Sequence, residues 1–447
     1  MKSNIKKVDT TNISEKLVGF FSETIEETAR ETKFVRRQSG ITGLNFLKAL
    51  ALGFLEKADA SLNELAQSFL DLGVVVTPQG VDERINRFSV AFLRAVFLQA
   101  LTIFKNYCPL PLAVLRQFSA INIVDSSVKA LPEDMANDYP GCGGKGSTAA
   151  LKIQLVFEFL FGNLKQVEIR PGTEADQGYR AYLKVVERGS LTIVDLGYFC
   201  LNAFAAMAAK SAYFLSRFFH STALQDESGK RIDLEALLRK TDSIADVPVQ
   251  LGCQHALPCR LIILRNSQAV TEKRRRTAKE HAKKRGVTLS QSYLFTLGWT
   301  LFITNAPATM ISIQHIYDFY RIRWQIELIF KLWKSYCGLN HILEWRKERV
   351  LTELYAKMIG IVLVHFLVAP LRIPDDLWSE REVSHVRFRK VLERFARSFK
   401  QCLSDVFTLA KKLDDFLIHV QRFALKQKRR THPNTFSLLA DMVIPLA

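Results

Sequence analysis

Apolar side chains recur at helical spacing near the start of the chain. Residues 42–57 place them three and four positions apart, which is typical of a helix with one buried face. Ser61 followed by Glu64 has the spacing of a capping box, in which each residue satisfies a free backbone N–H of the other. This pair predicts a helix over 62–72. We therefore expect residues 1–115 to be helical.

A second helix is expected shortly after the first. Thr77 is a suitable N-cap and Pro78 suits the first helical position, so a helix is predicted over 79–88. It would expose Arg84 and Arg87, and two short helices joined by a turn make a DNA-binding helix-turn-helix a hypothesis. An ordinary helical hairpin explains the pattern equally well, because this region of the chain is almost neutral.

The pattern changes to an alternation of apolar and polar residues from about residue 119. A strand is predicted over 120–124, directly before Asp125. A glycine-rich loop follows, and alternation then resumes over 151–159. Gly162-Asn163 turns the chain, and residues 164–170 return it as a hairpin.

Helices and strands then alternate up to residue 217. We predict a helix over 175–188, a buried strand over 191–194 that ends at Asp195, a helix over 201–210 and a strand over 212–217. Antiparallel strands followed by helix-and-strand crossovers predict the α/β class, with a mixed sheet covered by helices.

The segment 218–296 has a different character. It holds short strand candidates and then a basic helix, whereas sheet character resumes at Trp299 and a long helix is predicted over 313–336. The segment therefore reads as a mainly β insertion into a domain that closes afterwards. The five predicted regions are a helical DNA-binding region 1–115, a first core segment 116–217, the insertion 218–296, a second core segment 297–370 and a helical region 371–447 that could dimerise.

Composition narrows the functional classes. The chain has 447 residues, 48% hydrophobic and 24% charged, which favours a sizeable core and argues against disorder. The formal net charge of +18 favours a polyanionic partner, nucleic acid before a membrane surface. Seven scattered cysteines fit a reducing cytosol. No secretory signal is expected, and the apolar run 361–369 is shorter than a membrane span. We expect a soluble, cytoplasmic protein.

Two acidic residues follow buried strands. Asp125 comes after Ile-Asn-Ile-Val and Asp195 after Leu-Thr-Ile-Val, so each apolar strand delivers a carboxylate to the rim of the core, where a charge needs a counter-ion or a metal. Either aspartate alone could form a turn or cap a helix. The matched pair favours a shared site.

A third acidic residue lies on the predicted helix 313–336. Steps of three, four and seven residues place four side chains within about 60° of one helix face. They are Tyr320, Arg323, Glu327 and Lys334. A solvated stripe of charges is the alternative, but the aromatic and apolar neighbours favour a helix packed on both sides.

Three carboxylates without spaced His or Cys ligands suit hard divalent cations such as Mg²⁺, with Mn²⁺ as a substitute. Two such ions can activate a water or a 3′-hydroxyl and stabilise the leaving oxygen at a phosphodiester. Arg323 and Lys334 on the same face would then bind phosphates and offset negative charge.

The two Asp motifs, with the helix spacing Tyr, two residues, Arg, three residues, Glu, six residues, Lys, resemble the bacterial DDE transposases of insertion-sequence family four. The resemblance covers most of the chain. It implies a ribonuclease-H-like core interrupted by a mainly β insertion between the second Asp and the Glu. Here 132 residues separate Asp195 from Glu327, which is long enough for such an insertion.

The resemblance also implies roles for individual residues. Asp125, Asp195 and Glu327 would be the catalytic metal ligands, and Tyr320, Arg323 and Lys334 would contact phosphates at the transposon end. Trp299 matches a residue that stacks on a flipped base during cleavage through a DNA hairpin, although it could equally be a core tryptophan on a buried strand. Arg217 matches a DNA-contacting arginine. Leu196 departs from the pattern, since many relatives have Arg there, and this puts one local phosphate contact in doubt.

Ten Lys and Arg against two Glu lie between Arg260 and Arg285, which is nearly half of the net charge. Such a run is often only a solvated face, but its place in the insertion favours contact with the DNA backbone, and Arg274, Arg275 and Arg276 are candidates. Arg84 and Arg87 are candidates for reading terminal repeats. Two other motifs are weak: Cys253, His255 and Cys259 lack a second pair for zinc, and the glycine-rich loop 141–146 lacks the spacing for nucleotide hydrolysis.

We therefore expect a metal-dependent DNA transposase. It would bind terminal inverted repeats and target DNA, cut and join strands with two Mg²⁺ ions, and act as a homodimer in the synaptic complex. The alternatives are a nuclease of the same fold that does not integrate, and an inactive DNA-binding protein derived from a transposon.

Overall fold

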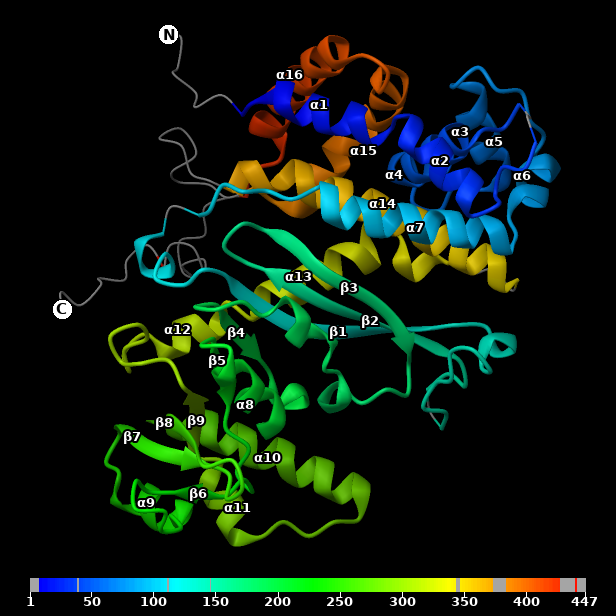
Figure 1. Cartoon of the computed structure of the whole chain (residues 1–447). Coiled ribbons are helices and arrows are strands. Elements are labelled where there is room, and N and C mark those ends of the chain that lie inside the picture. The colour runs from blue at the N-terminus through cyan, green and yellow to red at the C-terminus, as the bar shows by residue number, and fades with distance from the viewer. Residues whose placement is uncertain are drawn as a thin grey trace.

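The computed structural model describes residues 8–37, 40–110, 112–144, 146–342, 346–372, 383–426 and residue 439. Figure 1 shows three layers of organisation: helices from both ends of the chain lie together, a sheet lies below them, and the insertion extends the sheet at the far side. The N- and C-terminal helices pack together, with α1 (Thr10–Phe20) beside α16 (Val406–Phe423).

The N-terminal region is helical, as the apolar spacing predicts. The predicted helix over 42–57 is continuous but contains one π turn, and the Ser61–Glu64 capping box is confirmed. Its helices after α1 are α2 (Glu23–Glu31), α3 (Gly43–Leu47), η1 (Lys48–Leu52), α4 (Gly53–Glu56), α5 (Leu62–Leu70), α6 (Pro78–Arg84) and α7 (Arg87–Ile103).

The helix predicted over 79–88 is two helices. Thr77 caps α6 with Pro78 at its first position, as predicted, but α6 ends at Arg84. Asn86 caps α7 with a second capping box, so Arg87 begins a different helix from Arg84. The two arginines therefore do not share one recognition helix.

Strands from the core and the insertion form one nine-stranded sheet with the order β3-β2-β1-β4-β5-β9-β8-β7-β6. The first three strands are an antiparallel meander, and β4 and β5 run parallel to β1, which is the ribonuclease-H-like order. The strands are β1 (Ile121–Ala130), β2 (Ala150–Glu158), β3 (Asn163–Pro171), β4 (Leu191–Val194), β5 (Tyr213–Arg217), β6 (Leu224–Gln225), β7 (Ile244–Leu251), β8 (Leu257–Arg265) and β9 (Trp299–Thr304).

Two local predictions in this sheet are wrong. Strand β1 does not end before Asp125 but continues to Ala130, because β2 pairs with it along its whole second half. The helix predicted over 175–188 is replaced by two 3-10 segments, η4 (Asp176–Gly178) and η5 (Ala181–Val185). The carbonyl of Leu183 there accepts from the Val186 N–H three residues on and also from Lys210 Nζ, a residue at the end of the following helix.

The insertion is joined to the core through its own strands. Strand β8 pairs with β9 in antiparallel register, so the insertion and the core share a continuous sheet. The predicted basic helix is α10 (Gln268–Arg285), capped by Ser267 and ended by Gly286 in the left-handed conformation. Its helical elements also include α9 (Leu234–Lys240) and α11 (Gln291–Thr296), and α8 (Leu201–Ala209) precedes it in the core.

The long helix predicted over 313–336 is interrupted. Helix α12 (Ile316–Arg321) and helix α13 (Trp324–Ser335) are separated by a tightened turn at Ile322 and Arg323, where backbone N–H groups bond to carbonyls three residues back. Tyr320 and Glu327 therefore lie on different helices. The break keeps Arg323 between them.

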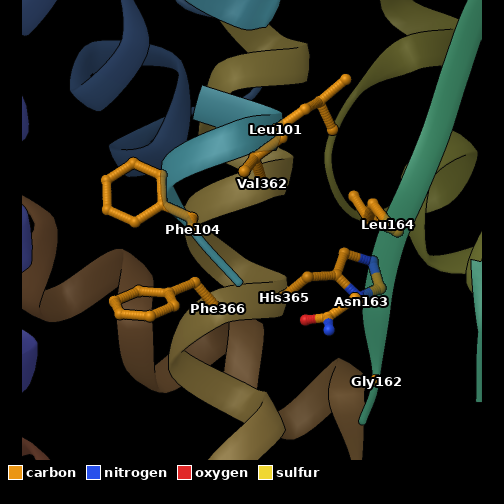
Figure 2. A pocket seen from close by; sticks show the side chains of 8 residues that line it. All are labelled: Leu101, Phe104, Gly162, Asn163, Leu164, Val362, His365 and Phe366. Atoms are coloured by element: carbon orange, nitrogen blue, oxygen red, sulfur yellow. The ribbon is translucent and has the colours of Figure 1, made fainter. Parts of the chain in front are cut away.

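Helix α14 (Lys347–Val368) forms the centre of the helical layer. The segment Lys347–Leu371, which is α14 and the turn after it, is long and apolar enough to cross a membrane, although the apolar run 361–369 alone is too short. However, 94% of its most apolar stretch is buried inside the protein. Figure 2 shows His365 of α14 between α7 and the start of β3. The His365 ring accepts a hydrogen bond from Trp333 Nε1 at 2.9 Å, which ties α14 to α13.

The described residues of the C-terminal region are helical, as predicted, with η8 (Ala369–Arg372), α15 (His385–Cys402) and α16. Helices α15 and α16 pack against each other and against the N-terminal helices. The basic run at 428–430 lies outside the described residues.

Candidate active site

The alternation of side chains along β1 brings Asp125 to the face of the sheet that α13 covers. Ile121 and Ile123 belong to the larger hydrophobic core, and Asp125 continues this odd-numbered series. Ile326 of α13 packs into the same core. Strand β4 runs parallel to β1, and Ile193 pairs with Ile123. Asp195, two residues after Ile193, therefore corresponds to Asp125 and faces the same side of the sheet. Both aspartates therefore emerge toward α13.

Arg323 connects two of the three predicted carboxylates. Its Nη1 lies 3.5 Å from Asp125 Oδ2, and its Nη2 donates to Glu327 Oε1 one turn further along. Burial works against the Arg323 charge, but the hydrogen bond to Glu327 and the nearby acidic groups raise its pKa. The break between α12 and α13 makes this bridge possible, because it holds Arg323 at the start of α13.

Asp125 interacts electrostatically with Asp195, Arg323 and Glu327. Burial, together with the negative charges of Asp195 and Glu327, raises its pKa to about 6, although Ser126 N–H and Arg323 work in the opposite direction. Asp195 Oδ1 accepts from Gly197 N–H at 2.8 Å, which fixes its side chain at the start of η6 (Leu196–Tyr198). The three carboxylates thus share one electrostatic environment.

Asp125, Asp195 and Glu327 interact electrostatically, but their side chains do not converge on one point. Among the residues that the structure describes, no three His, Cys, Asp or Glu side chains are close enough to hold a metal ion as they stand. The Arg323 guanidinium takes the place of a cation between Asp125 and Glu327. A set of carboxylate oxygens gathered around a positive charge is chemically suited to a hard divalent cation. The carboxylate oxygens of Asp125, Asp195 and Glu327 therefore fit such an ion by their chemistry.

Tyr320 and Lys334 flank this group. Tyr320 is half-buried with the Arg323 guanidinium 5.9 Å from its ring centre, and burial raises the pKa of its hydroxyl. Lys334 Nζ donates to the carbonyl of Val128 on β1 at 2.9 Å. Burial lowers the pKa of Lys334. Arg323, Glu327 and Lys334 therefore lie along β1, whereas the Tyr320 ring packs on Phe302 of β9.

Sequence reasoning missed Lys129 at this edge. Residues 125, 127 and 129 alternate onto one face of β1, so Lys129 lies on the same side as Asp125. Its Nζ donates to the carbonyl of Asn340 at 3.3 Å, and Lys334 is close enough to contribute to lowering its pKa, after burial and Lys357. The period-two pattern could have identified it if the strand had been extended past Asp125.

Arg217 and Arg274 lie next to each other and near Tyr320. Burial, followed by the Arg217 charge, lowers the pKa of Arg274, and Arg217 also acts on the Tyr320 hydroxyl. Arg274 Nη1 donates to the Trp299 carbonyl at 3.0 Å. Two adjacent guanidinium groups beside the acidic group form a place where an anion would be stabilised.

Trp299 is buried, with 7% of its surface exposed, at the start of β9. It lines a cavity of about 580 Å³ in the insertion, whose wall also contains Phe295 and three arginines. Arg265 lies 5.6 Å from the Trp299 ring centre, and Arg239 lies 4.5 Å from that of Phe295. A cavity with aromatic rings and cations suits a planar, electron-rich group.

The basic run of the insertion is only partly a free surface. Arg260 pairs with Asp246 and donates to two core carbonyls, and Arg275 Nε donates to the Leu294 carbonyl at 2.9 Å, so these side chains have structural partners. The exposed basic side chains of α10 are Lys273, Arg276, Lys279, Lys283, Lys284 and Arg285. Contact of Arg274, Arg275 and Arg276 with DNA stays a prediction.

The N-terminal candidates lie apart from this group. Arg87 is exposed with its guanidinium 4.8 Å from the Phe88 ring centre, and Arg84 is half-buried. Helix α6 is bound to the start of α14, because Arg346 donates to Asp82 at 3.0 Å. Their role in reading terminal repeats stays a prediction.

A ribonuclease-H-like sheet with one aspartate on its first strand and another directly after its fourth is typical of enzymes that transfer phosphoryl groups on nucleic acids. The family described as Transposase DDE domain matches residues 116–363. The chain belongs to this family and is an insertion-sequence transposase of the DDE type. DDE transposases act on DNA, catalyse its cleavage and strand transfer, and generally use divalent metal ions.

Named relatives agree with this assignment. The transposase for insertion sequence element IS1151 of Clostridium perfringens is 26% identical and is covered over 93% of both chains. The transposase for IS231E of Bacillus thuringiensis subsp. finitimus is 29% identical, over 91% of this chain and 89% of that one. A solved structure of the piggyBac transposase synaptic complex with hairpin DNA aligns at 11% identity with a TM-score of 0.46, over 97% of this chain and 88% of that one.

Proposed function

We propose that Asp125, Asp195 and Glu327 are the catalytic carboxylates and bind two Mg²⁺ ions, for which Mn²⁺ can substitute. The observation that carries this proposal is that Arg323 contacts both Asp125 and Glu327, while burial and then the charges of Asp195 and Glu327 raise the pKa of Asp125. Divalent ions could replace the guanidinium at small cost in free energy, because either one compensates the buried negative charge of the carboxylates.

The protein residues would then divide the work. Bound ions supply activation of a water or a 3′-hydroxyl and stabilise the leaving oxygen. Arg323, displaced from Asp125, would pair with a phosphate near the scissile bond, and Lys334 would hold a neighbouring phosphate from its position beside Val128. The Tyr320 hydroxyl, which burial keeps protonated at neutral pH, would donate a hydrogen bond to the DNA backbone.

The test is strand transfer with Mg²⁺ and DNA that carries the ends of the element. Asp125→Ala and Glu327→Ala are expected to abolish both cleavage and joining. Asp318→Asn is the matched control, since Asp318 lies on α12 and pairs with Arg321 rather than with the site. Full activity in either alanine variant would contradict the assignment. Cleavage without joining in the wild type would favour a nuclease, and binding without cleavage an inactive DNA-binding protein.

The exposed cations of α10 support a proposal that this helix contacts the DNA backbone. Replacing Lys283 and Lys284 with Glu should weaken DNA binding equally for all sequences. It should also make the salt dependence of binding less steep, because a protein that makes fewer phosphate contacts releases fewer counterions when it binds. The control is the same change at Lys411 and Lys412 on α16. An unchanged salt dependence in the α10 variant would exclude this contact.

Trp299 and its cavity support the proposal of a hairpin intermediate in which a flipped base stacks on the indole. A base stacked on an aromatic side chain contributes about 1–3 kcal/mol. Because Trp299 is buried, the insertion must open at this cavity for the base to enter. Trp299→Ala should retain first-strand nicking and lose most hairpin formation in a gel assay with end-labelled DNA. Equal loss of both steps would indicate a purely structural tryptophan.

We further propose that a homodimer holds two terminal inverted repeats and target DNA in the synaptic complex, with the C-terminal helices as the pairing region and the N-terminal helices reading the repeats. The protein would be cytoplasmic and associated with the nucleoid when bound to DNA. Light scattering of the complex with two DNA ends tests the stoichiometry, and a mass of one protein chain per two ends would refute it.

A further inference from the structure

Asp176 is a carboxylate beside the site that has no role in the proposal above. Its Oδ1 accepts hydrogen bonds from four side chains on three different elements. The donors are Ser126 Oγ at 2.8 Å, Lys152 Nζ at 3.1 Å, Gln154 Nε2 at 3.1 Å and Tyr198 Oη at 3.4 Å.

This network lies on the opposite face of the sheet from α13. Ser126 is the even-numbered neighbour of Asp125, so its side chain points away from the face that carries the carboxylate. Lys152 and Gln154 lie on the corresponding face of β2, where Val156 belongs to the second hydrophobic core together with Tyr198. Asp176 thus contacts the back of the strand that presents Asp125.

The same carboxylate reaches the segment that presents Asp195. Tyr198, which donates to Asp176, lies in η6 immediately after Asp195. A Cβ built on Gly197 would lie 3.1 Å from Asp195 Oδ1 and 3.8 Å from Asp176 Oδ2, so the backbone of this turn passes between the two aspartates. One side chain therefore holds the segments of both proposed metal ligands.

Burial makes these contacts rigid. Gln154 and Tyr198 are 0% and 2% exposed, and the single Tyr198 hydroxyl proton is shared between Gln154 Oε1 at 2.5 Å and Asp176 Oδ1 at 3.4 Å. The Lys152 side chain is 9% exposed and forms an ion pair with Asp176. A network whose members are buried and hydrogen-bonded to one another has little freedom to rearrange.

We propose that Asp176 is a positioning residue that fixes β1 and η6 relative to each other, so that Asp125 and Asp195 are held for metal binding. The role rests on the proposed metal site. It is indirect: Asp176 acts through Ser126 and Tyr198 and from the far face of the sheet. Partners that orient metal ligands contribute about 10–100-fold to metal affinity in known sites.

The test is the Mn²⁺ concentration that gives half-maximal cleavage, measured on the full-length protein with DNA ends. Asp176→Asn and Ser126→Ala should each raise this concentration about tenfold or more, with activity largely restored at saturating Mn²⁺. The double variant should need no more Mn²⁺ than Asp176→Asn alone, because both changes remove the same hydrogen bond between Ser126 and Asp176. Ser126→Ala removes a single hydroxyl and keeps the test open if Asp176→Asn folds poorly.

Asp71→Asn is the matched control. Asp71 pairs with Lys400 at 3.0 Å, and the Lys400 side chain is 0% exposed, so this change also removes the nearer carboxylate from a buried lysine, but in the helical layer and not in the sheet. It should lower thermal stability without changing the Mn²⁺ requirement.

Several outcomes would overturn the positioning role. An unchanged Mn²⁺ requirement in Asp176→Asn would do so, as would additive effects of the two changes. Loss of activity at every Mn²⁺ concentration in Asp176→Asn, with a normal Ser126→Ala variant, would indicate a direct ligand instead. Failure of the proposed metal site itself is separate, because it would appear as metal-dependent activity in Asp125→Ala.

Discussion

Replacing Asp125 with Asn should inactivate the enzyme and at the same time stabilise the metal-free protein. The Asp125 side chain is 19% exposed, and burial is the main cause that raises its pKa from the ordinary value of 3.8 to about 6. Keeping this group ionised at neutral pH therefore costs the folded protein free energy. An uncharged amide of the same shape does not carry that cost.

The magnitude follows from the pKa. A difference between 3.8 and about 6 corresponds to about 3 kcal/mol of unfolding free energy at neutral pH. This value already includes the attraction to Arg323 at 3.5 Å, because the Arg323 charge is one of the causes that lower the same pKa. We expect Asp125→Asn to gain most of this, about 2–3 kcal/mol, which raises the melting temperature by about 2–3 °C in a chain of 447 residues, because the entropy of unfolding grows with chain length.

The pH dependence provides an internal control. The folded pKa is raised, so the cost of the aspartate is fully present above about pH 6 and disappears as the pH falls toward 3.8, where the group is protonated in both folded and unfolded protein. The advantage of Asp125→Asn should therefore shrink between pH 6 and pH 4. The assay is thermal unfolding with a chelator present, followed by Mn²⁺ addition, which should stabilise the wild type more than the variant.

Two results would refute this reasoning. One is a variant that is less stable than the wild type at pH 7 without metal, which would mean that Asp125 is a structural partner of Arg323 rather than a site held ready for a cation. The other is a variant that still cleaves DNA ends.

Two further predictions concern stability. Glu64→Gln should lower the free energy of unfolding by about 0.5–1 kcal/mol at pH 7, because the hydrogen bond from Lys57 and the capping contacts to Ser61 lower the Glu64 pKa to about 2. This stabilisation is present above about pH 4.5 and is lost as the pH falls toward 2, so urea titrations of the variant and the wild type should converge there. Glu27→Gln, at an exposed position, is the control and should match the wild type at every pH. Trp333→Phe should lower the free energy of unfolding by about 2–3 kcal/mol in the same assay, because it removes the hydrogen-bond donor to His365 and leaves a cavity at a position that is 0% exposed. Trp324→Phe, at a position that is 55% exposed, is the control and should change the free energy of unfolding by less than about 0.5 kcal/mol. Equal effects of the two changes would contradict this packing.

Local chemistry in the sequence determined much of this protein. Ser61, Glu64 and Thr77 set helix starts through side-chain contacts that span three residues, and the structure confirms them. Strands β2, β3 and β4 follow the alternation or the short apolar runs that predict them. These features depend on neighbours in the chain, so they can be read without knowing what packs against them. The spacing of the helix motif identified the family for the same reason.

Tertiary structure decided the rest, since those features depend on distant partners. Pairing with β2 extends β1 beyond Asp125, and two 3-10 segments with a long-range contact from Lys210 to the Leu183 carbonyl stand where an α-helix was predicted. The placement of Arg323 between two carboxylates and the four contacts of Asp176 exist only once separate strands and helices meet. Hydrogen bonds and ion pairs between segments far apart in the chain leave no periodic trace in the sequence, and here they shape the proposed catalytic site.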